Sequence, residues 1–305
     1  MRVVIGNAIL ARVLVCAAAM AALGVAYYWR MALAREKGGD SAAPPLWVSA
    51  SPAGRLGNQL FTAAVVHGIA ARRGARVCLD FAEWADKEIF RAVVWPVRQC
   101  PAGARLEDVN DGGMYARYVP EKVVDACPNR SIKVGGCLQS FRYWSGVVEP
   151  PFRLKASRWA RQWIQERGIR IGIHARRGDY LTSLGHVGKT PPISYYAAAL
   201  ARLNVTNSGA EEVLVCSDDP DWVETKLLFR GMHVSRGLTP GQDMALLAEC
   251  DHVIVSAGTF GWWAAYLKRG DGKVFYYVNP DNDAATGVFV YGDHFPPAWV
   301  PIGIS

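Results

Sequence analysis

Short apolar runs alternate with amphipathic stretches from residue 46 onward, and this alternation predicts strands followed by helices. In the first half we expect a strand at 46–50, a helix at 59–73 and a second strand at 75–79. Apolar residues in the helical segment recur at intervals of three and four. A strand, helix and strand in this order are typical of a parallel sheet. Residues 81–150 show no clear period, so no elements are predicted there.

The second half alternates more regularly. It predicts strands at 169–174, 212–216, 232–235, 252–256 and 273–278, and helices at 157–167, 194–203, 220–228, 243–250 and 259–268. Pro220 suits the first turn of its helix, and Asp243 is placed to cap the helix that it begins. The alternation predicts an α/β fold with a doubly wound parallel sheet, in which ligands bind at the carboxyl ends of the strands.

The N-terminal segment has a different character. Residues 13–29 are 17 consecutive uncharged residues, near the lower limit of about 17 for a membrane-spanning helix. They end in Tyr27-Tyr28-Trp29, which is typical of an interfacial aromatic belt. We expect a short cytoplasmic tail at 1–12, an uncleaved transmembrane signal anchor at 13–29 and a flexible stem at 30–45. A cleavable signal peptide is the alternative, because the alanine run offers small residues at a cleavage site.

Composition narrows the class of protein. The 305 residues are 51% hydrophobic and 20% charged, which excludes a disordered or coiled-coil chain. The net charge is +7, of which residues 41–305 carry only +4. Because no concentrated basic stripe is present, the sequence argues against a nucleic-acid-binding protein.

Cysteines and glycosylation sequons fit an oxidising compartment. Apart from Cys16 in the apolar segment, six cysteines could form up to three disulfides, whereas Cys216 and Cys250 lie in apolar runs and are expected to be buried thiols. The absence of a Cys-x-x-Cys pair argues against a structural zinc site. Sequons at Asn129 and Asn204 are candidate N-glycosylation sites.

The segment His174-Ala-Arg-Arg-Gly-Asp179 leaves a predicted strand with two adjacent arginines. A guanidinium group can bind phosphate through two hydrogen bonds. Successive side chains of an extended segment point to opposite sides, so we expect Arg176 and Arg177 to have different roles. One would reach into a cleft while the other pairs with a carboxylate. The alternatives are a surface arginine pair and, more weakly, an Arg-Gly-Asp integrin ligand.

Two predicted helix starts could hold an anion. Gly54-Arg-Leu-Gly-Asn58 precedes the first helix, and its glycines let the backbone approach a ligand near free N–H groups. A tight strand–helix turn is the alternative there. Ser256 and Thr259 supply hydroxyls at a second helix start. The following Trp262-Trp263 pair is expected in the core rather than stacked on a sugar.

Carboxylates follow predicted strands as well. Asp218 and Asp243 could each accept two N–H bonds from the edge of a guanine base, and helix capping is the alternative for both. Two Asp-x-Asp pairs, at 219–221 and 281–283, match the loose pattern of metal-dependent glycosyltransferases. That pattern is too common to indicate a metal site.

Together these motifs resemble those of the galactoside α-1,2-fucosyltransferases. In order they are Gly54-Arg-Leu-Gly-Asn-Gln59, His174-Ala-Arg-Arg-Gly-Asp-Tyr180, Ser217-Asp-Asp-Pro220, and the segments 243–252 and 256–266. The resemblance implies a GT-B-like fold of two Rossmann-like lobes, which we place at 46–155 on the acceptor side and 156–305 on the donor side. It implies GDP-fucose as donor substrate, inversion at the anomeric carbon, and no required metal or cofactor. It also implies a single-pass type II Golgi membrane protein with a luminal catalytic part.

Carried over by position, the resemblance implies a donor site. Its expected members are Gly57, Asn58, His174, Arg176, Arg177, Asp218, Asp243, Ser256, Gly258, Thr259 and Phe260. Arg176 would contact the diphosphate with support from Arg177, Asp243 would meet guanine, and Asn58 would lie near the diphosphate and the acceptor. The sequence departs from the family at Ala175, where Val or Leu is usual, and at Gln59, where Glu is usual in vertebrates.

The expected reaction moves L-fucose from GDP-fucose to the 2-hydroxyl of a terminal β-galactoside on a glycan. Arg176 and Asn58 would act at the reacting diphosphate, Asp179 is the first candidate for a catalytic base, and His186 is the second. Two alternatives stay open, a protein O-fucosyltransferase and an inactive sugar-nucleotide or glycan-binding protein on the same fold. The acceptor glycan is not specified, because residues 81–150 match the family poorly.

Overall fold

The computed structural model describes residues 44–79, 93–94, 98–182, 190–205, 212–227, 231–280 and 287–304. The predicted tail at 1–12 and anchor at 13–29 lie outside these residues, as does the stem except for its last two positions. Within the described part of the chain, no helix combines the length and apolar character that a membrane span requires. Residues 46–305 form one compact unit.

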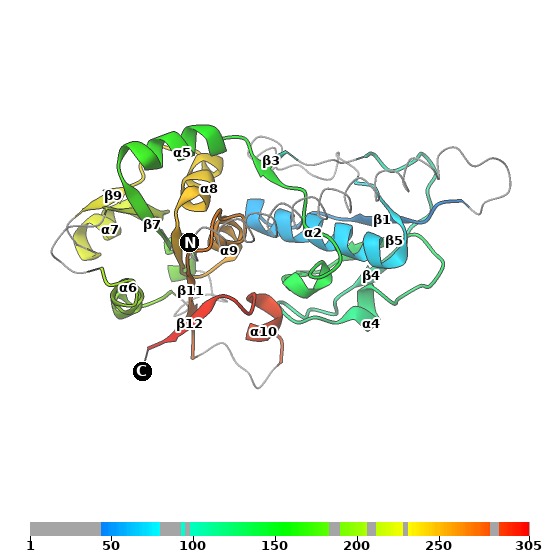
Figure 1. Cartoon of the computed structure of the whole chain (residues 1–305). Helices are drawn as coiled ribbons and strands as arrows, with labels where there is room; N and C mark the ends of the chain where they lie inside the picture. Colours follow the sequence, from blue (N-terminus) through cyan, green and yellow to red (C-terminus); the bar gives the residue numbers. More distant parts are fainter. Residues whose placement is uncertain are drawn as a thin grey trace, which may run out of the picture. The chain divides into compact units, whose positions relative to one another are not determined.

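Two parallel sheets organise this unit (Figure 1). The first has the order β2-β1-β5-β4, formed by Arg76–Val77, Trp47–Ala50, Ile132–Gly135 and Glu107–Asn110. The second has the order β12-β11-β10-β7-β8-β9, formed by Val300–Gly303, Val274–Val278, His252–Val255, Ile169–Ala175, Glu212–Ser217 and Met232–Val234. All pairings between these strands are parallel, which confirms the predicted α/β fold with parallel sheets.

Helices pack on both sheets. They are α2 (Leu56–Arg73), α4 (Pro120–Val123), α5 (Ser157–Glu166), α6 (Ile193–Ala201), α7 (Pro220–Lys226), α8 (Pro240–Glu249), α9 (Thr259–Tyr266) and α10 (Tyr291–His294), with short 3₁₀ turns η1 (Phe141–Tyr143) and η2 (Gly178–Leu181). A small antiparallel pair joins β3 (Val93–Val94) to β6 (Arg153–Leu154). The long helix α2 contacts β1 of the first sheet and α9, which packs on β10 of the second. The predicted lobe boundary at residue 155 stays a prediction.

Most predicted elements form close to their expected bounds, but one cap prediction is wrong. The helix expected at 243–250 begins three residues earlier, at Pro240. Thr239 caps it through a hydrogen bond from the Gln242 N–H, and the Gln242 side chain accepts from the Thr239 N–H in return. This capping box satisfies the first turn, so the carboxylate of Asp243 is not a cap.

Residues 81–150 contain elements that the sequence pattern did not predict. Strands β4 and β5 are each four residues long, and β4 buries only Val109. Such short strands carry too little periodicity to be recognised, since hydrogen bonding to their neighbours in the sheet defines them. The strand predicted at 75–79 is only two residues long, Arg76–Val77, because hydrogen bonding to the neighbouring strand also sets its length.

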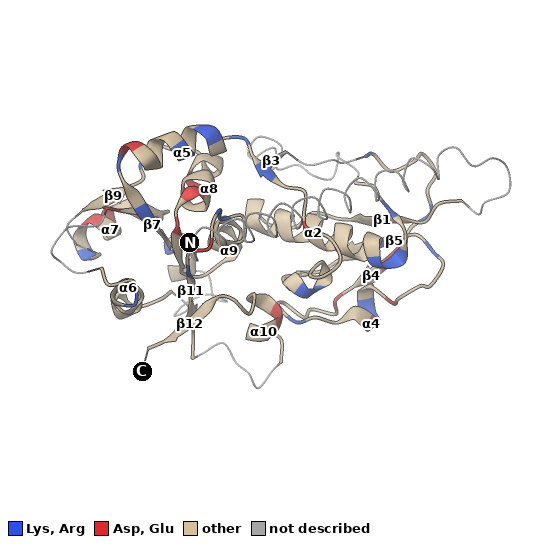
Figure 2. Ribbon diagram, in the orientation of Figure 1, with Lys and Arg blue, Asp and Glu red and all other residues tan. Residues whose placement is uncertain are grey.

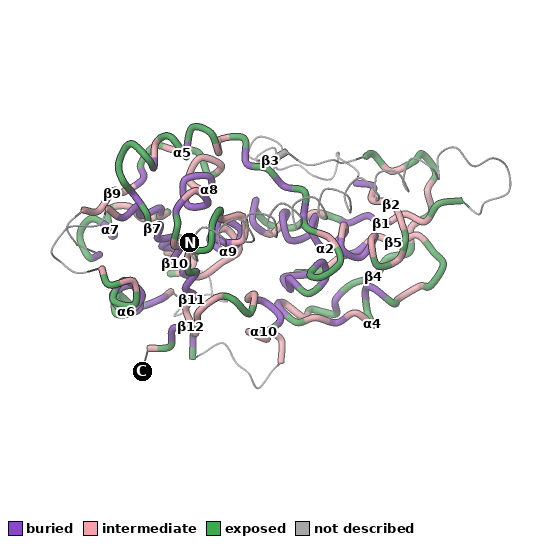
Figure 3. Tube along the Cα trace, viewed as in Figure 1, coloured by how far each residue is buried: buried purple, intermediate pink, exposed green. Residues whose placement is uncertain are grey.

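An aromatic core joins α2 to α9. Trp262 and Trp263 are 1% and 0% exposed, which confirms that they are core residues. Phe61 on α2 lies 4.5 Å from Trp262 between ring centroids, and Trp144 stacks on Trp263 at 5.7 Å. Along α2, no charged residue occurs before Arg72, and most of the helix is buried (Figures 2 and 3). The helix is therefore an internal element of the fold.

The cysteines follow the sequence expectation in part. Cys78 and Cys100 form a disulfide, and Cys216 and Cys250 are buried free thiols, as predicted. The two remaining described cysteines, Cys127 and Cys137, are also free. Of the three disulfides that the sequence allowed, the described residues therefore contain one.

Candidate functional site

A cavity of about 450 Å³ lies where the carboxyl ends of strands from both sheets meet. The first sheet contributes the loop after β1, which runs from Gly54 to Asn58, and Tyr115 after β4. The second sheet contributes the segments that follow β7, β8 and β10, together with the start of α8. Parallel strands place their carboxyl ends at one edge, so residues distant in sequence converge there. The predicted location of the ligand site therefore matches a real cavity.

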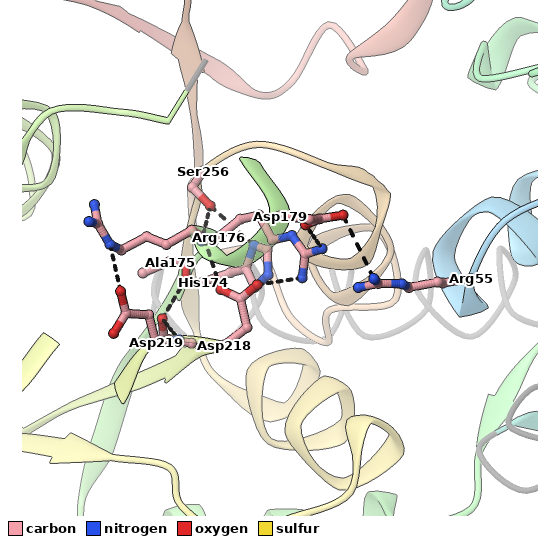
Figure 4. Close-up of polar contacts among 10 residues, drawn as sticks. Arg55, His174, Ala175, Arg176, Asp179, Asp218, Asp219 and Ser256 are labelled. Carbon is pink, nitrogen blue, oxygen red and sulfur yellow. Dashed lines mark hydrogen bonds and ion pairs between the residues drawn. The ribbon is translucent and has the colours of Figure 1, made fainter. Parts of the chain in front are cut away.

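Arg176 is the central cation of the cavity wall (Figure 4). It follows β7, and its side chain is 19% exposed. One guanidinium nitrogen pairs with Asp218 Oδ2 at 2.6 Å, and another pairs with Asp179. Its backbone N–H donates to Ser256 Oγ at 2.7 Å, which ties the end of β7 to the loop after β10. Two carboxylates and one hydroxyl thus hold Arg176 in place.

Arg177 lies away from the cavity lining. Its Nε pairs with Asp219 Oδ2 at 3.1 Å, and its guanidinium lies 3.9 Å from the ring centroid of Trp222. The two adjacent arginines therefore diverge as the extended backbone predicts. The backbone N–H of Arg177 donates to Asp218 Oδ1 at 2.8 Å, so Arg177 supports the carboxylate that holds Arg176. This place fits a supporting role and not a direct ligand contact.

Two helix N-termini meet at the cavity. The N-terminus of α2 touches that of α9 so closely that a Cβ on Gly57 would lie 2.6 Å from Thr259 Oγ1 and 2.7 Å from the Phe260 nitrogen. Thr259 Oγ1 donates to Asn58 Oδ1 at 2.7 Å. The free N–H groups and positive dipole ends of two helices favour an anion at this point. Gly258, with a φ of 85°, forms the turn into α9.

His174 lines the cavity but is only 5% exposed. Its Nδ1 is 3.3 Å from Ser256 Oγ, and a Cβ on Gly261 would lie 2.2 Å from the same nitrogen. Burial, with a smaller contribution from the charge of Arg176, lowers the pKa of His174 to about 3. The imidazole is therefore neutral near pH 7, and His174 positions β7 against α9 without adding charge to the site.

The carboxylates of the wall have distinct environments. Asp218 and Asp179 both pair with Arg176, and Asp179 Oδ2 also lies 3.7 Å from Arg55 Nη2 across the cavity mouth. Asp243 lines the cavity near Ser235, whose hydroxyl donates to its Oδ1. Burial raises the pKa of Asp243, although the hydrogen bond from Ser235 opposes this effect. The carboxylate of Asp243 therefore does not cap α8, and it can accept hydrogen bonds from a ligand in the cavity.

Sequence reasoning missed several lining residues. Arg55 and Tyr180 stand inside the recognised motifs but were given no role, and Leu238 precedes the capped helix. Tyr115 comes from the stretch without a period, where no pattern could reveal it. Each of these residues is recognised as part of the site only by its proximity to the other lining residues in the folded chain.

Three further predictions concern residues away from the cavity. His186 lies outside the described residues, so its role as second candidate base stays a prediction. Asn129 and Asn204 are exposed in turns, each with a φ of 59°, which suits the predicted glycosylation sites. In the described part of the chain, no group of three or more His, Cys, Asp or Glu side chains is placed to hold a metal ion. The metal requirement stays a prediction.

The fold and cavity are typical of parallel α/β proteins that bind an anionic ligand at their strand ends. Residues 160–303 match the sequence model of "Glycosyl transferase family 11". These residues, which supply the second sheet and most of the cavity wall, are similar to glycosyltransferase family 11. The resemblance predicted from the motifs is therefore confirmed.

Curated relatives are named galactoside fucosyltransferases. Galactoside 2-alpha-L-fucosyltransferase Sec1 of Mus musculus is 34% identical over 139 residues, 43% of this chain and 38% of that protein. Galactoside alpha-(1,2)-fucosyltransferase 1 of Homo sapiens is 36% identical over 149 residues, with the same coverage of 43% and 38%. The chain thus spans less than half the length of the curated relatives that it matches.

Solved structures are more distant. NodZ alpha-1,6-fucosyltransferase co-crystallised with GDP has a TM-score of 0.48 and 15% identity, covering 78% of this chain and 97% of that chain. A variant of Arabidopsis thaliana FUT1 in complex with GDP has a TM-score of 0.49 and 14% identity, covering 84% and 75%. Both TM-scores fall below 0.5, so these proteins are remote in structure as well as in sequence.

Proposed function

We propose that this protein is an inverting glycosyltransferase that moves L-fucose from GDP-fucose to the 2-hydroxyl of a terminal β-galactoside on a glycan. The observation that carries the proposal is the family 11 match over residues 160–303, which include Arg176, Asp218, Asp243 and the start of α9 at the cavity. The names of the curated relatives support the linkage and the galactoside acceptor. The cavity volume of about 450 Å³ lies within the usual range of roughly 300–1,000 Å³ for ligand pockets.

Charge stabilisation would supply most of the catalysis. As fucose leaves GDP, negative charge grows on the β-phosphate, and donors already aimed at that position lower the barrier. Arg176 and the N–H groups at the starts of α2 and α9 border the same cavity, and they are the groups that would meet this charge. Asp243 would accept N–H bonds from guanine. In this proposal, guanidinium and helix N–H groups do the work of a metal ion.

An alternating chain of charges crosses the cavity mouth. It runs from Arg55 through Asp179 and Arg176 to Asp218. The donor diphosphate carries negative charge, so it would compete with the carboxylates for both guanidinium groups. Donor binding would release Asp179, and the freed carboxylate could then accept the proton of the acceptor hydroxyl. Asp179 would thus become available as the base only after the donor has bound.

Fold and location complete the proposal. Two parallel sheets with their carboxyl edges at one cavity fit a GT-B-like arrangement of two Rossmann-like lobes. The uncharged segment 13–29 would anchor the protein in the Golgi membrane as a single-pass type II protein with its catalytic part in the lumen. The Cys78–Cys100 disulfide suits that oxidising compartment.

The full chain in detergent tests the function directly. It is incubated with GDP-fucose and a panel of terminal β-galactosides, with and without EDTA, and the linkage of the product is read by NMR. We expect an α-1,2-linked fucosyl product at equal rates in both conditions. GDP binding without fucose transfer would indicate a binding protein, and fucose on a serine or threonine of a protein acceptor would indicate a protein O-fucosyltransferase.

A further inference from the structure

Gln139 is a buried polar residue next to the cavity that the proposed function does not use. It follows β5 and is 3% exposed. Its backbone is fixed from both sides, because its N–H donates to the Tyr115 carbonyl at 3.2 Å and its carbonyl lies 2.6 Å from His294 Nδ1. The preceding Leu138 has a φ of 53°, an uncommon conformation for a bulky residue. Strain of this kind gathers at functional sites.

The side chain of Gln139 contacts Asn58 of the cavity wall. Its Nε2 donates to Asn58 Oδ1 at 3.3 Å. Asn58 Oδ1 accepts a second hydrogen bond from Thr259 Oγ1 at 2.7 Å. Asn58 Oδ1 therefore accepts two hydrogen bonds, one from Gln139, which follows a strand of the first sheet, and one from Thr259, which follows a strand of the second.

This occupancy fixes the direction of the Asn58 amide. An amide that accepts through oxygen must turn its two N–H groups the other way. Nδ2 lies beside the backbone of Gly54, where a Cβ would approach it to 2.2 Å, and both residues line the cavity. In the described part of the chain, Nδ2 has no hydrogen-bond acceptor of its own. It is available to an oxygen atom of a ligand.

We propose that Gln139 is a positioning residue that turns the Asn58 amide so that its N–H groups donate to a phosphate oxygen of the bound nucleotide. This inference rests on the proposed function and extends it to a residue outside the recognised motifs. An acceptor at position 139 would reverse the arrangement, because it would attract Nδ2 and turn Asn58 Oδ1 toward the phosphate. Asn58 Oδ1 would then face the phosphate oxygens and repel the nucleotide.

Two substitutions separate this role from simple packing. Gln139→Met keeps the volume and removes the hydrogen bonds, and a neutral hydrogen bond is worth roughly two- to tenfold in affinity. Gln139→Glu keeps the shape but supplies an acceptor. We expect GDP affinity, measured by calorimetry near pH 8 on the full chain, to fall about threefold in the first variant and at least about 30-fold in the second. Gln165→Glu, at an exposed position of α5, adds the same charge and should bind like the wild-type chain.

The pH dependence of GDP affinity distinguishes this positioning role from a purely structural role, because a structural role would not change it. Below its pKa the carboxyl of the Gln139→Glu variant is protonated and can again donate to Asn58 Oδ1. Its GDP affinity should therefore approach that of the Gln139→Met variant, or exceed it, as pH falls from 8 to 5. The groups that face position 139 are Tyr115 and His294, with Asp293 and Arg142 next to them. They are common to all variants, so their titration cancels in the ratio of affinities.

Each outcome decides a separate question. Equal affinities of the Gln139→Glu and Gln139→Met variants at every pH would overturn the inference. The expected ranking of GDP affinities without any fucose transfer by the wild-type chain would support the inference and overturn the proposed enzyme. No GDP binding by the wild-type chain, with folding verified by circular dichroism, would overturn both.

Discussion

Arg176 owes its position to neighbours that come from three strand ends. Asp218 follows β8, Ser256 follows β10, and Asp179 lies in the turn after β7 itself. Truncating Arg176 removes the central cation of the wall, so Asp218 loses its ion-pair partner there and Asp179 keeps only Arg55. The loss therefore acts on ligand binding and on the charge that develops during reaction.

We expect Arg176→Ala to reduce transfer by roughly 10²-fold or more, the range found for single groups that stabilise a developing oxyanion. The measurement is kcat/KM with GDP-fucose. Arg236→Ala is the matched control, since Arg236 also pairs with two carboxylates, Asp221 and Glu224, but lies outside the cavity lining. Near-normal turnover of a folded Arg176→Ala variant would remove the phosphate role.

Substitution of Asp179 should affect fucose transfer and pyrophosphate binding in opposite ways. Asp179→Asn should abolish transfer if the carboxylate is the base, because an amide cannot accept the proton. The same substitution removes a competitor for Arg176 and Arg55, so inorganic pyrophosphate should bind as tightly as to the wild-type chain or more tightly. Calorimetry with pyrophosphate and a transfer assay separate the two effects. Unchanged transfer would discard Asp179 as the base.

The contact between α2 and α9 depends on a glycine. Gly57 has no Cβ, and this allows the two helix N-termini to approach within van der Waals contact. Thr259 and Asn58 can hydrogen-bond only at that separation. The anion seat is therefore a property of the pair of helices, and neither helix forms it alone.

We expect Gly57→Ala to destabilise the protein by about 1–3 kcal/mol and to weaken GDP binding, because its Cβ would meet backbone atoms of α9. Urea unfolding gives the first quantity and calorimetry the second. Gly292→Ala on α10 is the control, since no atom lies within 4 Å of a Cβ placed there. If both variants are equally stable and bind GDP alike, the close approach of the helices does not matter.

Two buried histidines join distant parts of the chain. His174, a residue of β7, packs against Gly261 of α9, and His294 on α10 contacts the carbonyl of Gln139 in the first half of the chain. Asp293 strengthens the second junction by pairing with Arg142 at 2.6 Å. Both histidines must stay neutral, because burial lowers the pKa of His174 to about 3 and that of His294 to about 4.

These histidines predict how stability depends on pH. An unfolded histidine has a pKa of about 6.5, so between about pH 4 and 6.5 the unfolded chain binds more protons than the folded chain. The free energy of unfolding should therefore fall as pH falls through this window, by up to roughly 1.4 kcal/mol per pH unit for each histidine. Urea unfolding at pH 7 and pH 5 measures the change. A His294→Gln variant should show a shallower slope, and an unchanged slope would contradict the assignment.

The sequence by itself determined the alternation of strands and helices in residues 156–305, because buried strands and long helices imprint their period on the apolar residues. It also placed Arg176, Asp218 and Thr259 at strand ends and helix starts. Only the tertiary structure decided that Arg177 turns away from the cavity and that Thr239 and not Asp243 caps α8. It also decided that Tyr115 lines the cavity and that Gln139 hydrogen-bonds the lining residue Asn58. These features depend on contacts between residues far apart in the chain, and local periodicity carries no record of such contacts.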